Sequence, residues 1–466
     1  MLLKRLYEEK LAQVSYMVGC TLIKEAVVID PVRDIEQYIE AARSEGLRIT
    51  RVIETHIHAD FASGALALAQ ATGAQLLVSA EGGPEWQYDF AGERYVRTLH
   101  HGDQIPLGNV RLEVLHTPGH TPEHLCFLLT DEAAATTAPL GLFSGDFLFV
   151  GGVGRPDLLE KAVGHAGTMD AGARQLFRSL QRLCELPDSL LILPGHGAGS
   201  ACGKSLGGFP FSSLGYERLA NPALRIEDED SFVAEILRDQ PEPPRYFADM
   251  KRVNRIGVGR WSGDEPEVLS AAALAQAPWI VDLRHGAAFA SGHIPGSITI
   301  PLGPQFLSWA GSILPFNAKV ALVAENSRRA TAATRELALI GYDNILGWIE
   351  ARNAGHDLEP LDAIPAQSVT TASPGTDIVV DVRTTAEQRR GSIPGACHIP
   401  LGDLQSSALD ALPRNTRVSV FCQAGARSPI AWSILRRMGF TDVVHLAGGY
   451  DAWKSADESL PAGAEK

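Results

Sequence analysis

The 466-residue chain is too long for one ordinary domain, so roughly two to four domains are expected. A formal net charge of −14 without a long basic run argues against a nucleic-acid phosphate track, and no apolar run is long enough to span a membrane. The charged residues 1–10 are unlike a signal peptide, and six scattered cysteines without a CxxC pair are typical of a reducing compartment. We expect a cytoplasmic protein with small-molecule partners; a homo-oligomeric state stays open.

The first part of the chain alternates strand-like and helical patterns. Apolar runs at residues 13–18 and 26–30 predict strands, and a helical pattern extends from there to about Gly46. Strands and helices then alternate as far as His196, which predicts an αββα sandwich. We assign residues 1–240 to this domain.

Four polar turns in this region each follow a strand-like run. They are residues 55–61 (THIHADF), 116–120 (HTPGH), 144–146 (SGD) and 194–197 (PGHG). A pair of histidines two apart is more often structural than metal-binding when it stands alone. Four such turns together indicate metal ligands presented at one edge of a sandwich.

The order of these turns resembles that of the metallo-β-lactamase fold superfamily over roughly residues 10–230. In its binuclear zinc hydrolases the first motif is HxHxDH, and its last His holds the second metal. Phe61 stands at that position here and has no lone pair to give. The resemblance therefore points to the persulfide dioxygenases, and implies one Fe(II) on His56, His120 and Asp146, for which zinc could substitute. The residues expected to orient ligands, or to serve as alternative ligands, are His58, Asp60 and His196.

A glycine-rich loop, residues 151–158 (GGVGRPDL), follows Asp146. Glycines allow close backbone approach to a substrate, and an arginine inside such a loop can hold a carboxylate; a solvated surface arginine is the alternative. In persulfide dioxygenases a similar loop contributes an Arg to the carboxylate of a glutathione-like thiol, and the resemblance implies this role for Arg155. Cys202 follows His196 and is either an accessory thiol near the site or a buried bystander.

A Pro-rich cluster opens what we interpret as a linker, residues 241–259. Beyond it, the segments DLR, HIPG and IPLG of residues 282–303 recur 99 residues later as DVR, SIPG and IPLG. Such a period is the size of a domain, so residues 260–357 and 366–466 are predicted to be two copies of one α/β domain with a parallel sheet.

The second copy contains a buried strand that ends in a cysteine and a tight loop, residues 418–428. Backbone N–H groups of that loop, the start of the following helix and Arg427 all favour the thiolate form of Cys422. The C-x-x-G-x-R-S loop and the later LAGGYDAW segment resemble a rhodanese domain. The resemblance implies that Cys422 carries a persulfide with Arg427 as a catalytic partner, and that Gly425 and Ser428 bind substrate.

The first copy differs at the decisive position. Ala324 aligns with Cys422 and cannot carry a persulfide, and the neighbouring Glu325 makes the loop negative. We expect this copy to be a structural spacer or docking surface. Cys397, in a strand entry of the second copy, is expected to pack in the core.

The complete chain resembles bacterial fusions of a persulfide dioxygenase with rhodanese domains. Two histidines and a carboxylate on iron leave open positions for dioxygen and a sulfur ligand. The resemblance implies oxidation of a small thiol persulfide to sulfite with O2, coupled to sulfur exchange between Cys422, sulfite and thiosulfate. Two alternatives remain: a zinc thiolester hydrolase of the hydroxyacylglutathione type, and a non-catalytic persulfide sensor or relay.

Overall fold

The chain folds into two units in the computed structural model. The first comprises Met1–Gly263 and Ala338–Gly341, and the second comprises Asp264–Leu337 and Tyr342–Lys466. The described residues are 1–134, 136, 138–163, 167–204, 206–354, 358–365, 377–407, 409 and 412–458. The predicted domain limits at 357, 366 and 466 lie outside them. Within the described part, no helix is long and apolar enough to cross a membrane.

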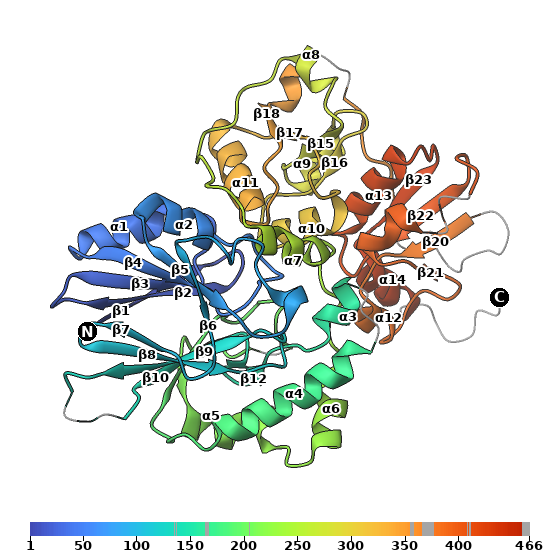
Figure 1. Ribbon diagram of the computed structural model, residues 1–466. Coiled ribbons are helices and arrows are strands. Elements are labelled where there is room, and N and C mark those ends of the chain that lie inside the picture. Colours follow the sequence, from blue (N-terminus) through green and yellow to red (C-terminus); the bar gives the residue numbers. More distant parts are fainter. Residues whose placement is uncertain are drawn as a thin grey trace. The chain divides into compact units, whose positions relative to one another are not determined.

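Two six-stranded sheets form the centre of the first unit (Figure 1). The strands of the first sheet, in spatial order, are β1 (Leu2–Glu8), β2 (Gln13–Cys20), β3 (Glu25–Ile29), β4 (Arg48–Ile53), β5 (Gln75–Ser79) and β6 (Val96–Leu99). Those of the second are β14 (Ser212–Ser213), β13 (Leu191–Pro194), β10 (Gly141–Gly145), β9 (Leu125–Asp131), β8 (Val110–His116) and β7 (Gln104–Leu107). A separate ribbon pairs β11 (Leu148–Phe149) with β12 (Gly152–Val153).

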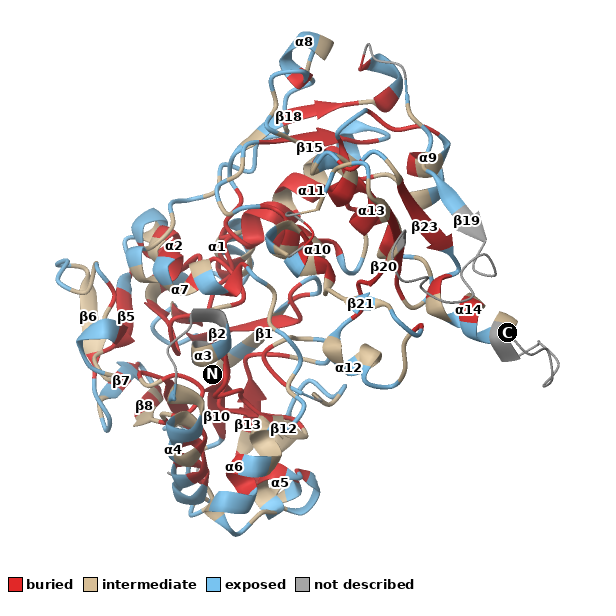
Figure 2. Cartoon of the chain, turned by 90° about the vertical axis from the view of Figure 1, so that its right-hand side faces the viewer, coloured by how far each residue is buried: buried red, intermediate tan, exposed pale blue. Residues whose placement is uncertain are grey.

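Apolar side chains of both sheets meet in one core. Every residue of β2 is buried, and β9 is buried from Leu125 to Thr130; Figure 2 draws buried strands of this unit, such as β10, in red. Residues from both sheets share one hydrophobic cluster, among them Val18, Val27 and Phe127. This burial is the main force that holds the two sheets together.

Helices cover the outer faces of this sandwich, which confirms the predicted αββα architecture. Helices α1 (Glu36–Ser44) and α2 (Ala65–Thr72) lie on the first sheet, as Figure 1 shows. The remaining helices of this region are α3 (Leu158–Val163), α4 (Thr168–Leu183), α5 (Leu214–Ala220) and α6 (Glu229–Leu237), with short 3-10 turns η1 (Pro84–Trp86) and η2 (Ala223–Arg225). Along α4, buried Leu176, Phe177 and Leu180 recur at helical spacing and pack in a second cluster with strands β9, β10 and β13.

The segment expected to be a linker contains a packed helix. Helix α7 (Phe247–Ile256) buries Phe247, Met250, Val253 and Asn254, and belongs to the first unit. The breaker cluster at Pro241 therefore does not end the sandwich unit, which continues to Gly263. The Pro-rich cluster led to the linker assignment, although Phe247, Met250 and Val253 recur at helical spacing.

The second unit contains two all-parallel sheets, as predicted. The first has the order β16 (Ile298–Thr299), β15 (Trp279–Asp282), β17 (Val320–Val323) and β18 (Ile345–Ile349). The second has the order β19 (Ala363–Pro365), β23 (Val443–Ala447), β22 (Arg417–Phe421), β20 (Asp377–Asp381) and β21 (Cys397–His398). The helices are α8 (Ala271–Leu274), α9 (Gly286–Ser291), α10 (Phe306–Ile313), α11 (Ser327–Leu339), α12 (Thr385–Gln388), α13 (Ser428–Arg437) and α14 (Gly449–Glu458), with 3-10 turns η3 (Ala351–Asn353) and η5 (Leu401–Ser406).

The two sheets repeat one strand–loop–helix arrangement. Strand β17 leads through Ala324 into α11, and β22 leads through Cys422 into α13. Cys397, expected in the core, is exposed in β21 instead, because this two-residue strand lies at the edge of its sheet.

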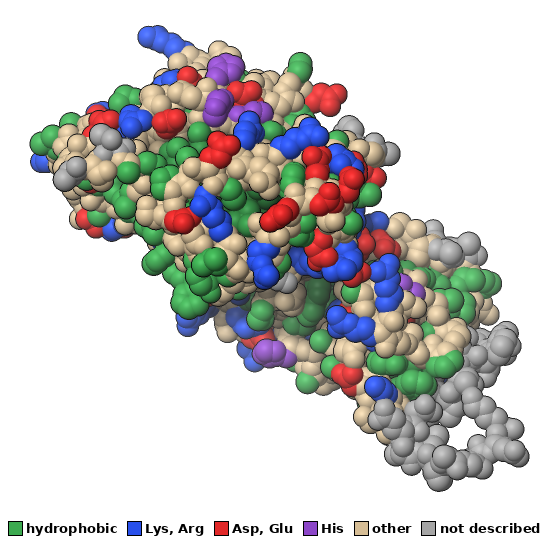
Figure 3. Space-filling view, turned by 90° about the horizontal axis from the view of Figure 1, so that it is seen from below, with side chains coloured by type: hydrophobic (Ala, Val, Ile, Leu, Met, Phe, Trp, Pro, Cys, Tyr) green, Lys and Arg blue, Asp and Glu red, His purple; other side chains and the backbone are tan. Residues whose placement is uncertain are grey.

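On the face shown in Figure 3, acidic and basic side chains are interspersed without a continuous basic track.

Candidate functional site

Three side chains from three strand ends converge in the first unit. His56 follows β4, His120 lies between β8 and β9, and Asp146 follows β10. One ligand atom of each lies within 4.8 Å of the others, and all three residues are buried. Asp146 Oδ2 is 4.0 Å from His56 Nε2 and 3.6 Å from His120 Nε2. The structure therefore brings together the three residues predicted to hold iron.

The other ring nitrogen of each histidine is already engaged. Thr55 Oγ1 donates to Asp30 Oδ2 over 2.8 Å, so it accepts from His56 Nδ1 at 2.9 Å. His120 Nδ1 donates to the carbonyl of Arg155 over 3.0 Å. Both imidazoles thus turn the lone pair of Nε2 toward Asp146, the arrangement found for metal-ligating histidines.

The electrostatics of the cluster suit a cation. Burial lowers the pKa of His56 and His120, which keeps both imidazoles neutral. Burial alone would raise the pKa of Asp146, but His196, His56 and His120 outweigh it and hold that pKa well below its ordinary value. Among the described residues, His56 Nε2 and Asp146 Oδ2 find no hydrogen-bond partner. Two neutral nitrogens and one carboxylate oxygen therefore fit a divalent metal ion.

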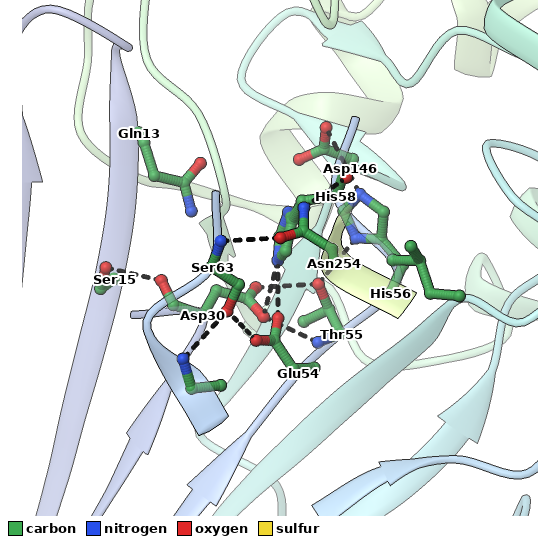
Figure 4. A network of polar contacts seen from close by, with 12 residues as sticks. Gln13, Ser15, Asp30, Glu54, Thr55, His56, His58, Ser63, Asp146 and Asn254 are labelled. Atoms are coloured by element: carbon green, nitrogen blue, oxygen red, sulfur yellow. Dashed lines mark hydrogen bonds and ion pairs between the residues drawn. The ribbon is translucent and has the colours of Figure 1, made fainter. Parts of the chain in front are cut away.

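His58 points away from this cluster. Figure 4 shows its ring directed toward Asp30 and Glu54, and Nε2 lies 3.3 Å from Asp30 Oδ1 and 3.0 Å from Glu54 Oε2. Burial alone would lower the pKa of His58, but the two carboxylates outweigh it and raise that pKa well above its ordinary value. A protonated His58 has no lone pair on Nε2, so this arrangement gives it an ion-pairing role.

Asp60, His196 and Cys202 form a neighbouring buried group. His196 Nε2 lies 3.2 Å from Asp60 Oδ2 and 3.3 Å from Asp146 Oδ1, so it bridges the two carboxylates. Burial raises the pKa of Cys202 well above that of an ordinary thiol, with Asp60 and Asp146 adding to the effect. A protonated, buried thiol is a poor nucleophile.

Phe61 fills the position at which a second metal ligand would stand. Its side chain is fully buried, and its ring centroid lies 4.3 Å from that of His58. The side chain offers the adjacent Asp60 and His196 no donor atom for a second ion. Phe61 therefore adds no ligand to the neighbouring group of Asp60, His196 and Cys202.

Arg155, predicted to bind the substrate carboxylate, is engaged by groups of the protein itself, and its substrate role stays a prediction. Its guanidinium is completely buried and pairs with Asp157 through Nε (3.0 Å) and Nη2 (2.8 Å). The same group donates to the carbonyls of Ala201 (3.0 Å) and Pro241 (2.7 Å). Two of these four hydrogen bonds tie the loop after Asp146 to distant segments, so Arg155 acts as a brace.

We predict that Arg155→Ala lowers the stability of the first unit. Removing one member of a buried, hydrogen-bonded ion pair costs roughly 3–5 kcal/mol, because Asp157 is left buried and uncompensated. Urea unfolding followed by circular dichroism measures this loss, with Arg94→Ala, at an exposed position, as the control. Unchanged stability together with a raised KM for carboxylate-bearing substrates would instead support a substrate-binding role for Arg155.

Helix α7 contributes a residue that sequence reasoning missed. The Nδ2 of Asn254 donates to the carbonyls of His58 and Phe61, both over 2.7 Å, and its Oδ1 accepts from Ser63 N over 2.8 Å (Figure 4). The hydroxyl of Tyr246 donates to the carbonyl of Asp60 over 2.7 Å. These bonds hold the backbone of the first polar turn from outside. No local pattern could reveal them, since about 190 residues separate the partners.

Two further buried residues support the ligands. His124 accepts from the backbone N–H of Asp146 at Nε2 over 3.2 Å, while its Nδ1 lies 2.9 Å from Thr117 Oγ1. Tyr88 donates to the carbonyl of His56 over 2.9 Å. His124 lies four residues after His120, and this spacing was the signal available in the sequence.

We predict that Asn254→Asp weakens metal binding without affecting the second unit. Aspartate keeps the acceptor for Ser63 but loses both donors, and leaving a buried carbonyl unsatisfied costs roughly 1–3 kcal/mol. Metal titration of the protein should therefore show about a tenfold or larger loss of affinity. An exposed residue on the same helix provides the control, Arg252→Ala. Wild-type affinity in Asn254→Asp would show that the turn holds its shape alone.

The second unit presents the thiol of Cys422 in a cradle of backbone N–H groups. Gly425 N and Arg427 N donate to Sγ over 3.2 and 3.3 Å. Cys422 is buried, and Ser428 Oγ lies 3.8 Å from Sγ and 3.3 Å from His445 Nδ1. Ser428 is completely buried and lies beside the thiol, and its predicted role in substrate binding stays a prediction.

The guanidinium of Arg427 is turned to Glu387. Its Nη1 and Nη2 donate to the two carboxylate oxygens of Glu387 over 2.7 and 2.5 Å. Burial would raise the pKa of Glu387, but Arg427 and Thr384 outweigh it and lower that pKa to about 2. The backbone N–H of Arg427 thus holds the thiol, while the side chain of Arg427 braces the loop. In the first copy, buried Ala324 occupies the same place at the end of β17.

Comparison with known proteins also divides the chain into a metal-site part and two repeated α/β parts. The model of the Metallo-beta-lactamase superfamily matches residues 13–196, and that of the Rhodanese-like domain matches residues 266–350 and 367–456. The crystal structure of a metallo-beta-lactamase from Staphylococcus aureus subsp. aureus COL is 42% identical, with a TM-score of 0.69, and covers 75% of this chain and 99% of its own. The chain belongs to the metallo-beta-lactamase superfamily and carries two rhodanese-like domains.

Two other relatives each match about half of this chain or less. The mitochondrial persulfide dioxygenase ETHE1 of Bos taurus is 29% identical over 260 residues, which are 55% of this chain and 89% of the relative. The hydroxyacylglutathione hydrolase of Polaromonas sp. is 37% identical over 185 residues, which are 39% of this chain and 61% of the relative. The chain thus spans less than two thirds of that hydrolase.

Proposed function

We propose that the protein oxidises the outer sulfur of a low-molecular-weight thiol persulfide and transfers sulfur through Cys422. The metallo-beta-lactamase part would be a persulfide dioxygenase that uses one Fe(II), and the second rhodanese-like domain a sulfurtransferase that makes or consumes thiosulfate. The similarity to a protein named persulfide dioxygenase supports the first activity. The cradle around the thiol of Cys422 supports the second.

One observation carries the choice of an iron dioxygenase. The buried His56, His120 and Asp146 converge, while Phe61 gives no ligand beside Asp60 and His196. Two nitrogens and one carboxylate are the donor set of the facial triad of non-haem iron oxygenases. Bound there, Fe(II) would supply dioxygen activation and open coordination positions.

The surrounding residues have distinct tasks in this proposal. Thr55 and the carbonyl of Arg155 fix the two ligand imidazoles by their Nδ1 atoms, and His196 orients Asp146 through Oδ1. Dense packing around the cluster excludes bulk water, which protects a reactive sulfur species. The overall reaction converts RSSH, O2 and H2O into RSH, sulfite and two protons.

Cys422 would then exchange sulfur with the product. A persulfide on Cys422 is attacked by sulfite at its outer sulfur, which releases thiosulfate and the cysteine thiolate; the reverse reaction loads Cys422 from thiosulfate. Gly425 N and Arg427 N stabilise the thiolate that leaves, because both N–H groups point at Sγ.

A second candidate is a thiolester hydrolase, favoured by the relative named hydroxyacylglutathione hydrolase. Hydrolysis in such enzymes uses a metal-activated water and neither consumes dioxygen nor produces sulfite. Phe61 weighs against it, since the binuclear pattern puts a histidine there.

Oxygen uptake with glutathione persulfide tests the proposal. The iron-loaded protein should consume one O2 and form one sulfite for each persulfide, and should leave S-lactoylglutathione unchanged. Hydrolysis of the thiolester without oxygen uptake would instead establish the second candidate.

A further inference from the structure

A pocket in the first unit borders the turn that carries the candidate ligand His120. It has a volume of about 280 Å³ and lies among η1, the 119–122 turn, the first half of α4 and α7. Its principal lining residues are Glu85, Trp86, Gly119, Gly172, Gln175 and Lys251. None of them takes part in the metal cluster.

The pocket is lined by the turn that carries His120, and one of its other lining residues lies near a residue that bonds the turn at His56. Gly119 immediately precedes His120 and packs on α4, where a Cβ at Gly172 would lie 3.2 Å from the carbonyl oxygen of Gly119. The lining residue Trp86 lies two residues before Tyr88, whose hydroxyl donates to the carbonyl of His56. A ligand seated in this pocket is therefore next to the backbone of the candidate metal site.

The pocket offers a cation in a partly desolvated setting. Lys251 Nζ lies 3.4 Å from the ring centroid of the buried Trp86, and the lysine is half-buried. The described residues give Nζ no hydrogen bond or ion pair, so all three of its N–H donors are available. A lysine held over an aromatic face in this way suits an anionic group of a ligand.

The negative charge of Glu85 and the volume of the pocket restrict the ligand further. Glu85 is exposed at the pocket and offers a carboxylate to an ammonium group, while Gln175 offers an amide. A volume of about 280 Å³ is at the small end of ligand pockets, which span roughly 300–1,000 Å³, so it suits a peptide-sized thiol and not a coenzyme A derivative.

We propose that this pocket binds the organic part of the thiol, with the carboxylate of a zwitterionic, peptide-sized substrate on Lys251. This proposal rests on the proposed persulfide substrate. In it, Lys251 takes the place of Arg155 as the group that recognises the carboxylate. Lys251 lies in α7, so the same helix that braces the first polar turn through Asn254 also selects the substrate.

Binding of the inert analogue S-methylglutathione to the complete protein tests this proposal by calorimetry. Lys251→Gln should bind about tenfold or more weakly, because a charge-assisted hydrogen bond contributes roughly 1.5–3 kcal/mol. Lys24→Gln, at an exposed turn of the same unit, should bind as the wild type does. Equal affinity of the Lys251→Gln and wild-type proteins would overturn the assignment.

The dimethyl ester of the same analogue gives a second test that needs no variant. Masking the ligand carboxylates should weaken binding to the wild type by a similar factor, and should have little further effect in Lys251→Gln. Wild-type protein that binds ester and acid equally would also overturn the proposal. Because neither measurement requires turnover, absent oxygen uptake would contradict the dioxygenase, whereas unchanged binding would contradict only the pocket.

Discussion

Replacing His120 with alanine is expected to abolish iron binding and persulfide-dependent oxygen uptake. The candidate triad has two imidazole nitrogens, and His120 provides one of them. Its buried ring is held by a hydrogen bond to the carbonyl of Arg155, so that Nε2 faces Asp146. Alanine leaves one nitrogen and one carboxylate, too few donors for a tightly held iron. Oxygen uptake should fall below about 1% of wild type, a loss of more than roughly 2.7 kcal/mol of transition-state stabilisation.

The second unit supplies an internal control for this variant. Sulfur transfer from thiosulfate to cyanide depends on Cys422 and should be retained in His120→Ala. A matched histidine substitution at an exposed site, His100→Ala, should leave both activities intact. Iron bound with wild-type affinity by His120→Ala would show that the ligands are other residues.

Replacing Cys422 with serine is expected to abolish sulfur transfer and spare dioxygenation. Only a sulfur atom at this position can form a persulfide, and a serine hydroxyl stays protonated at neutral pH. Thiosulfate-linked transfer should therefore become undetectable, while oxygen uptake with a supplied small persulfide should remain near the wild-type rate. Mass spectrometry of the wild type after thiosulfate treatment should show one added sulfur on the peptide that contains Cys422.

Cys397 is the matched control for that experiment. It lies in the same domain and is exposed, so Cys397→Ser tests whether an accessible thiol suffices. We expect Cys397→Ser to transfer sulfur normally, since the cradle of N–H groups surrounds the thiol of Cys422. Sulfur found on Cys202, or transfer retained by Cys422→Ser, would mean that the relay runs through the first unit.

Much of the fold follows from patterns that are local in the chain. The alternation of strands and helices predicts the sandwich, and the 99-residue repeat predicts the two parallel sheets. The polar turns at His56, His120 and Asp146 each follow a strand, one in the first sheet and two in the second, and they meet at one edge of the sandwich. The convergence of these three side chains is therefore predictable from the sequence.

The parts that sequence reasoning missed depend on contacts between distant segments. The glycine-rich loop predicts a substrate beside Arg155, yet the partners of this side chain include Ala201 and Pro241, which lie 46 and 86 residues away. The Pro-rich cluster predicts a linker around Asn254, yet this residue bonds the turn at His58 and Phe61. The apolar residues of α7 recur at helical spacing, but only the folded chain reveals the partners of a buried polar side chain on it.

Metal content of the protein purified without oxygen tests the central claim most directly. The arrangement of His56, His120 and Asp146, with Phe61 in place of a further ligand, predicts one iron per chain and persulfide-dependent oxygen uptake in proportion to that iron. Inductively coupled plasma mass spectrometry on samples of graded iron occupancy, paired with an oxygen electrode, gives both quantities. Two tightly bound zinc ions per chain, with no oxygen uptake after iron loading, would contradict the account.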